Sequence, residues 1–229
     1  MTVHFQGYGG SWNLAGTRPP KGFSADQIHV VVSAHGCLMN QSAEYYAAFK
    51  KTTESNGYGH AFDPAQNEKA ETAYFGGMTW RVMRAVEYVK TLPEWNGRDL
   101  TMEGGSQGGL QSIWAAALVP GVTKVDIYVP WGCNIGGTTD GRNHGDWYQE
   151  WRPGLDYYDT VNMARRIPKT CKVVISRVGM GDYIATPSSI SVFYNALTCP
   201  RRCAWLQGSQ HNSVPRPLVL EYCFRREGM

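Results

Sequence analysis

A serine set between glycines is the first feature of this chain that could carry chemistry. Residues 104 to 109 read Gly-Gly-Ser-Gln-Gly-Gly, so Gly104 and Gly108 lie two positions before and after Ser106. A nucleophile elbow requires small residues at those two positions, because its sharp strand-to-helix turn brings backbone atoms too close together for side chains. The pattern predicts a serine nucleophile, and its alternative is a glycine turn with a purely structural role.

A serine hydroxyl becomes a good nucleophile only when a histidine takes its proton and an acid orients that histidine. Two histidines follow Ser106, namely His144 and His211. His211 comes soon after a strand candidate that ends at Leu206, whereas His144 lies in an irregular segment rich in glycine and aromatic residues. We therefore predict His211 as the general base, the alternative being a hydrogen bond within its own loop.

The acid has more candidates, because several aspartates follow the serine. Asp182 stands in the sequence Gly-Met-Gly-Asp-Tyr, after an apolar strand candidate and before Pro187, which opens a helix candidate. The chain order serine, acid, histidine is that of the α/β-hydrolases, with the last two on loops after later strands. We predict Asp182 as the acid, its alternative being a turn residue; the other candidates are Asp126, Asp140, Asp146, Asp156 and Asp159.

An oxyanion formed at the serine needs two backbone N–H donors. One comes from the residue after the nucleophile, here Gln107, and the other from a loop after an early strand. The turn Gly7-Tyr8-Gly9 follows the first strand candidate, so we predict the Tyr8 amide as the second donor. A glycine-rich turn of structural purpose would look the same.

Strand candidates alternate with helix candidates along the chain, which predicts a three-layer α/β sandwich with a mostly parallel sheet. The run from Ile28 to Ala34 is nearly all β-branched, as in a strand buried on both faces. Residues 132–158 are predicted as a lid or pocket wall. The other strand candidates are 2–6, 99–102, 125–129, 171–176 and 203–206, and the helix candidates are 42–54, 72–91, the stretch after Ser106, 160–166, 187–197 and 215–224.

Composition excludes several classes of protein. A chain of 229 residues with 42% hydrophobic content fits one α/β domain over residues 1–229, and a net charge of +3 without a dense basic patch argues against nucleic-acid binding. No apolar run reaches the ~18 residues of a transmembrane helix, and Met1 to His4 lacks the features of a signal peptide. The six cysteines are scattered, which favours buried thiols over a disulfide scaffold or a metal site.

The start of the chain leads to a further expectation. Because the sequence begins directly on a core strand, we expect that upstream sequence has been removed or that the domain belongs to a longer protein. The compartment is therefore left open between the cytoplasm and, for a fragment, the periplasm or the exterior. The redox state of the cysteines is left open with it.

Several segments resemble one family of α/β-hydrolases in the same order along the chain. The elbow matches a GxSQGG motif, and the first loop is similar to a His-Gly-Tyr-small motif with Gln6 in place of histidine. This pattern resembles carbohydrate esterase family seven, the acetyl xylan esterases and cephalosporin C deacetylases. The further segments that carry the resemblance are 84–94, 158–162 and 182–195.

The resemblance implies a triad of Ser106, Asp182 and His211, with oxyanion donors at Tyr8 and Gln107. Two positions depart from the family. His35-Gly36-Cys37 replaces an Arg-Gly-Gln motif, and Asn212 replaces a glutamate after the histidine. The family's N-terminal segment with additional strands has no counterpart in the sequence given, which supports the expectation of missing upstream sequence and weakens any carry-over of the family's ring-like hexamer; the oligomeric state is left open.

We therefore expect a serine esterase that removes acetyl or other short acyl groups from an acylated carbohydrate such as a xylan fragment. The chemistry requires no metal or organic cofactor. Aromatic residues of the predicted pocket wall would contact sugar rings or simply pack, and we name Trp131, Trp147 and Tyr148 as the substrate-binding candidates. The alternatives are a serine peptidase of the same fold and a catalytically inactive hydrolase domain that binds glycans or proteins.

Overall fold

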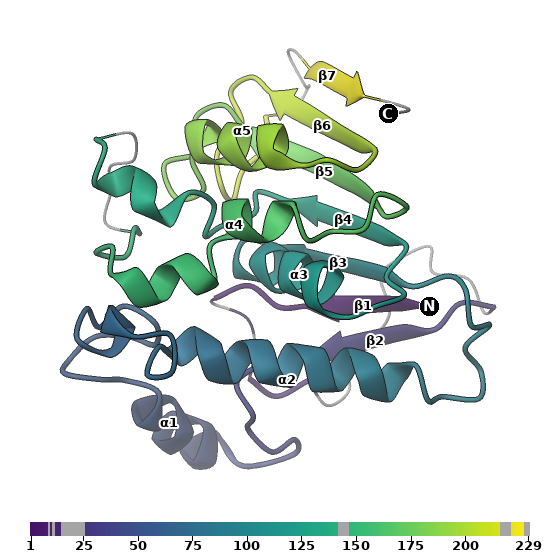
Figure 1. The fold of residues 1–229 in the computed structure, drawn as a ribbon. Helices are drawn as coiled ribbons and strands as arrows, with labels where there is room; N and C mark the ends of the chain where they lie inside the picture. The colour runs from purple at the N-terminus through teal and green to yellow at the C-terminus, as the bar shows by residue number, and fades with distance from the viewer. Residues whose placement is uncertain (9, 11, 15–25, 142–146, 216–220, 227–229) are drawn as a thin grey trace.

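A computed structural model describes the chain except at positions 9, 11, 15–25, 142–146, 216–220 and 227–229. Its centre is a seven-stranded sheet in the order β2-β1-β3-β4-β5-β6-β7, in which only β7 runs antiparallel to its neighbour (Figure 1). The predicted α/β layout with a mostly parallel sheet is confirmed. The strands are β1 Thr2–Phe5, β2 His29–Val32, β3 Thr101–Gly105, β4 Lys124–Tyr128, β5 Lys172–Gly179, β6 Arg201–Leu206 and β7 Glu221–Arg226.

The chain changes direction across the sheet at β1. After β1 it moves to one side to form β2, and then returns to form β3 on the other side of β1. In open parallel sheets, ligands bind at such a switch point, beyond the carboxyl ends of the two strands. Here β1 leads into the turn with Tyr8, and β3 leads into Ser106, so the two predicted features lie side by side.

In the described residues helices cover one face of the sheet, so the third layer of the predicted sandwich does not lie among them. Helices α2, α3, α4 and α5 lie on the same side in Figure 1, and α3 packs on β3, β4 and β1. No helix of the described residues is both long and apolar enough to cross a membrane. The helices are α1 Ala43–Thr52, α2 Tyr74–Val89, α3 Gln107–Leu118, α4 Thr160–Ala164 and α5 Pro187–Ala196, with short 3₁₀ turns η1 Gln66–Glu68, η2 Ile135–Thr138 and η3 Pro153–Tyr157.

The core lies between this helical layer and the sheet. Trp114 of α3 is fully buried, and its indole N–H donates to the Tyr158 carbonyl at 2.8 Å. Phe75 of α2 packs edge-on against the Trp114 ring. A buried indole that is both packed and hydrogen-bonded fixes α3 relative to the segment before α4.

Two predictions about secondary structure are wrong. The stretch 215–224 was expected to be a helix, but residues 221–226 form β7, which pairs antiparallel with β6. A free sheet edge offers unpaired backbone groups, and this tertiary pairing outweighs local helix propensity. The run around His29–Val32 was expected to be buried on both faces, yet β2 is an edge strand whose residues are all partly exposed.

The predicted pocket wall at 132–158 is only partly described. It contains η2 and η3, joined by irregular chain. Gly9, His144 and Asp146, which the sequence analysis names, lie outside the described residues.

Candidate active site

Ser106 lies in a strained turn between β3 and α3. Its backbone has φ 54° and ψ −122°, a conformation that residues with a side chain rarely adopt. A Cβ on Gly104 would lie 2.6 Å from the Gly108 carbonyl carbon, and one on Gly108 would lie 2.1 Å from the Phe5 oxygen. Only glycine fits at these two positions, as a nucleophile elbow demands.

The elbow is also tied to the end of the next strand. The Ser106 N–H donates to the Tyr128 carbonyl at 3.2 Å, and the Trp131 N–H donates to the Ser106 carbonyl at 3.1 Å. These two bonds hold the serine at the carboxyl edge of the sheet.

His211 and Asp182 form a buried pair. The distance from His211 Nδ1 to Asp182 Oδ2 is 2.8 Å, and the two residues are 7% and 3% exposed. Asp182 Oδ1 accepts hydrogen bonds from the Ile184 and Ala185 amides at 2.8 and 2.9 Å. One carboxylate oxygen therefore fixes the loop after β5, while the other is free to orient the imidazole. This leaves Nε2 as the ring nitrogen that can act as a base.

One cavity of about 520 Å³ brings Ser106 and His211 together. It opens at the carboxyl ends of the central strands, and Tyr8 contributes to its wall. The lining residues are Gly7, Tyr8, Gly10, Gly105, Ser106, Tyr128, Val129, Trp131, Trp147, Arg177, Ile184, His211 and Asn212. The predicted nucleophile and base thus face the same space.

Both predicted oxyanion donors belong to segments next to the serine. Gln107 is the first residue of α3, where a backbone N–H has no acceptor within the helix. Tyr8 follows β1, the strand directly paired with β3. A helix N-terminus next to the serine also carries a partial positive charge that favours an oxyanion.

His60, which the sequence analysis did not name, links these two residues. The Gln107 side-chain amide donates to His60 Nε2 at 3.3 Å, and the Tyr8 ring stacks on the imidazole with ring centres 4.1 Å apart. Burial, reinforced by neighbouring positive charge on His35, lowers the pKa of His60 to about 3. His60 is therefore neutral at physiological pH and can accept the bond from Gln107.

Comparison with known proteins decides the family. The acetyl xylan esterase (AXE1) family profile matches residues 1–153, well over half of the chain. The chain belongs to the acetyl xylan esterase family. Acetyl esterase Axe7A of Xylanibacter ruminicola is 30% identical over 183 residues, covering 76% of this chain and 40% of Axe7A. The chain thus spans less than half the length of that curated relative.

Two solved acetyl xylan esterases share the fold of this family member, which is the α/β-hydrolase fold. The enzyme from Thermoanaerobacterium sp. JW/SL YS485 superposes with a TM-score of 0.70 at 20% identity, over 94% of this chain and 70% of that one. The enzyme from Paenibacillus sp. R4 gives a TM-score of 0.67 at 20% identity, over 93% of this chain and 69% of that one. These two likenesses concern the fold.

None of the described aspartates of this acetyl xylan esterase family member lines the cavity, Asp182 included, so their bonding partners distinguish the candidates. Asp159 caps α4 and accepts backbone hydrogen bonds from Val161, Asn134 and Ile135, so it closes a structural turn. Asp126 pairs with Lys124, and Asp156 accepts from the Trp151 indole. Asp182 is the aspartate that bonds to His211.

Two of the three aromatic residues predicted to bind substrate line the cavity, and the third does not. Trp131 and Trp147 line the cavity, and the Trp131 indole donates to the Trp147 carbonyl at 2.9 Å. Tyr148 does not line it, because its hydroxyl is bonded with Thr186 and Ser189 at the start of α5. Tyr148 therefore connects the pocket wall to the helix that follows the acid loop.

Arg177 is a second residue that the sequence analysis did not name. It lines the cavity, lies over the Tyr128 ring at 5.3 Å, and donates to the His211 carbonyl at 3.0 Å. The guanidinium thereby fixes the backbone of the histidine loop. Its position inside β5 gave no sign of this role, because a register shift between Ile175 and Val178 interrupts the regular alternation of side chains there.

Proposed function

We propose that this protein is a serine ester hydrolase that removes acetyl groups from acetylated carbohydrates such as xylan fragments. The observation that carries the proposal is the shared cavity, in which Ser106 on its strained elbow faces the same space as His211 with Asp182 behind it. Membership of the acetyl xylan esterase family supports the acetyl group and the carbohydrate. Axe7A, named as an acetyl esterase, supports the same class of bond.

The proposed reaction runs through an acyl-enzyme. Ser106 Oγ attacks the ester carbonyl carbon while His211 Nε2 takes the hydroxyl proton, and the Asp182 carboxylate stabilises the imidazolium. The Tyr8 and Gln107 amides bind the oxyanion of the tetrahedral intermediate. As the intermediate collapses, His211 gives its proton to the leaving sugar oxygen, and acetyl stays on Ser106.

Water completes the cycle. His211 removes a proton from a water molecule, the resulting oxygen attacks the acetyl carbonyl, and acetate leaves as the proton returns to Ser106. Trp131 and Trp147 would contact the carbohydrate, and their position in the wall of the cavity supports this role. Tyr148 would act indirectly, by holding the pocket wall to the start of α5.

Hydrolysis of p-nitrophenyl acetate, butyrate and octanoate tests the proposal, with Ser106→Ala measured beside the unchanged chain. We expect a preference for acetate and a loss of at least about 10³-fold in kcat for Ser106→Ala. Release of acetate from acetylated xylan would then establish the carbohydrate. Ser112→Ala is a matched control, because Ser112 is a buried serine of α3 whose hydroxyl donates to the Gly108 carbonyl away from the cavity.

Two other outcomes would replace the proposal. Cleavage of peptide p-nitroanilides in preference to all three esters would favour a serine peptidase. Equal and slow hydrolysis by the unchanged chain and Ser106→Ala would favour an inactive domain, and glycan binding by calorimetry would then be the next measurement.

A further inference from the structure

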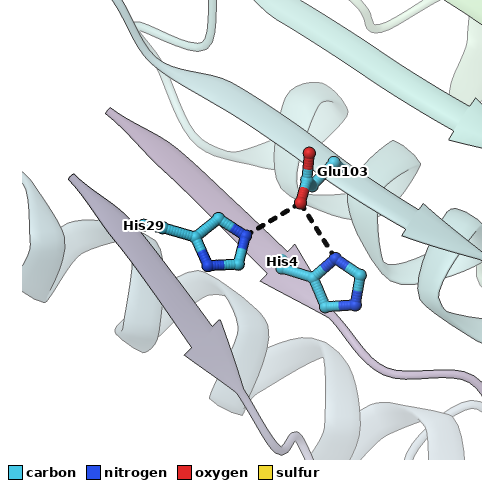
Figure 2. A group of neighbouring side chains, drawn as sticks. All are labelled: His4, His29 and Glu103. Carbon is cyan, nitrogen blue, oxygen red and sulfur yellow. Dashed lines mark hydrogen bonds and ion pairs between the residues drawn. The ribbon is translucent and has the colours of Figure 1, made fainter. Parts of the chain in front are cut away.

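Two histidines and a glutamate converge on the sheet away from the cavity described above. His4 Nδ1 lies 3.0 Å from Glu103 Oε1, and His29 Nε2 lies 2.9 Å from the same oxygen. Figure 2 shows both rings pointing at the carboxylate, from β1 and β2 toward β3. The three ligand atoms all lie within 4.8 Å of one another.

The register of the sheet fixes this convergence. His4 is paired directly with Glu103, and His29 is paired with Thr2, two residues before His4. Residues two apart on a strand project from the same face, so all three side chains share one face of three adjacent strands. The intervening Val3, Phe5 and Met102 are fully buried on the opposite, helix-covered face. The cluster therefore sits on rigid backbone and does not depend on a loop.

The chemistry of the three groups matches a transition metal. Zinc binds imidazole nitrogen and carboxylate oxygen at about 2.0–2.2 Å, which separates tetrahedral ligands by roughly 3.3 Å. The two measured N···O distances are only a few tenths of an ångström shorter. Small side-chain rotations would open room for an ion. Magnesium and calcium prefer ligand sets made only of oxygen, so this set does not suit them.

Exposure leaves one side of the cluster open. The His29 side chain is 5% exposed, whereas those of His4 and Glu103 are each 29% exposed. Three protein ligands with solvent access on one side leave the fourth tetrahedral position to water. The ion could also enter from that side.

We propose that His4, His29 and Glu103 form a binding site for one divalent transition-metal ion, with zinc as the representative. The site cross-links β2, β1 and β3 on the face opposite α3. His4 stands four residues before Tyr8, and Glu103 stands three residues before Ser106, so the bound ion would fix the relative position of the two strands that carry these residues. The role is structural, and the proposal is independent of esterase activity.

The competing interpretation is a hydrogen-bonded cluster in which both imidazoles donate to Glu103 without any ion. The variant Glu103→Gln separates the two, because the amide oxygen still accepts a hydrogen bond while the negative ligand is lost. Asp126→Asn is a matched control. Asp126 is paired with Glu103 on the neighbouring strand β4, is similarly exposed, and forms an ion pair with Lys124 instead.

The experiment strips the purified chain with chelator and titrates it with zinc ions alone, following heat by calorimetry and Tm by circular dichroism. We expect one zinc per chain and a rise in Tm that grows with free zinc, since an ion that binds only the folded state stabilises it by mass action. Glu103→Gln should weaken the affinity for zinc by more than about 100-fold. Loss of a residue that only hydrogen-bonds to a metal ligand costs roughly 10- to 100-fold in metal affinity, so a larger loss indicates that Glu103 is itself a ligand. Asp126→Asn should bind like the unchanged chain.

A second variant guards against misfolding of the first. His4→Gln removes a different ligand, and it should also abolish the zinc-dependent rise in Tm while leaving the metal-free Tm within a few degrees. Zinc binding that persists in both variants, or an unchanged chain whose Tm does not respond to zinc, would overturn the proposal and leave the hydrogen-bonded cluster.

Discussion

Gln107 donates its side-chain amide to the unprotonated Nε2 of His60 at 3.3 Å, while the backbone of the same residue begins α3. The residue after the proposed nucleophile is thus held both by a helix and by a buried histidine. His60 in turn lies flat against Tyr8, so one imidazole contacts both proposed oxyanion residues.

Replacing His60 by phenylalanine should destabilise the fold. The ring would still stack on Tyr8, but the buried Gln107 amide would lose its acceptor, which costs about 1–3 kcal/mol of unfolding free energy. Urea unfolding measures this. In the double variant His60→Phe with Gln107→Met both partners become apolar, and most of the loss should be recovered; a double variant no more stable than His60→Phe would contradict the role of this bond.

Stability should also fall in mild acid because of two neighbouring histidines, the buried His60 and the partly buried His35. Burial, with the nearby Arg81 charge, lowers the pKa of His35 to about 4, and burial, with His35, lowers that of His60 to about 3. Below pH ~6.5 these two histidines bind protons in the unfolded chain, whereas in the folded chain they remain neutral until the pH approaches their lowered pKa values. The contribution that these two neutral histidines make to the unfolding free energy should therefore be complete above pH ~6.5. It should decrease as the pH falls toward 4 for His35 and toward 3 for His60, by up to about 1.4 kcal/mol per pH unit for each histidine.

Urea unfolding between pH 7 and 5 checks this, because ordinary carboxylates change their charge little in that range. His60→Phe should show a shallower pH dependence than the unchanged chain. Equal slopes in the two proteins would assign the acid sensitivity to other groups.

Asp182→Asn should abolish most activity and leave the fold intact. An asparagine Oδ1 can still accept from the Ile184 and Ala185 amides, so the loop is preserved. Its NH₂ group would face His211 Nδ1 and favour the tautomer with a protonated Nε2, which cannot take the serine proton. A comparable change in another Ser-His-Asp triad lowers kcat about 10⁴-fold. Ester hydrolysis and Tm, measured on the same variant, check this. If Tm fell strongly together with kcat, the loss of activity would indicate misfolding instead.

Gly108→Ala should prevent stable folding or cost more than about 4 kcal/mol, because the new methyl group would lie 2.1 Å from the Phe5 oxygen. Gly136→Ala is the matched control, since its methyl group would meet the Trp151 ring at an ordinary 3.5 Å. Soluble yield and thermal unfolding compare the two. A Gly108→Ala variant as stable as the control would show that the turn can relax.

The site residues that come directly after strands could be predicted from the sequence. Ser106, Asp182 and His211 each come after a strand of a parallel sheet, and such strand ends meet at one edge. His60 could not be found in this way, because it lies in a polar stretch without periodicity and acquires its role only through burial against Tyr8. The strand β7 was missed because its pairing with the distant β6 edge decides its conformation.

The convergence of His4, His29 and Glu103 was missed for a related reason. The sequence separation between His4 and Glu103 is 99 residues, and no spacing rule joins them. Their contact depends on strand order and on a register that places His4 opposite Glu103. Neither quantity can be read from residue types alone.

Five cysteines in the described part of the chain are buried. Burial raises the pKa of Cys171 to about 12 and raises that of Cys133 still further, so these sulfurs are poor nucleophiles while the chain is folded. On unfolding they would return to ordinary reactivity. The chain therefore contains its own chemical reporter: the rate at which a thiol reagent modifies these sulfurs measures how often the native structure opens.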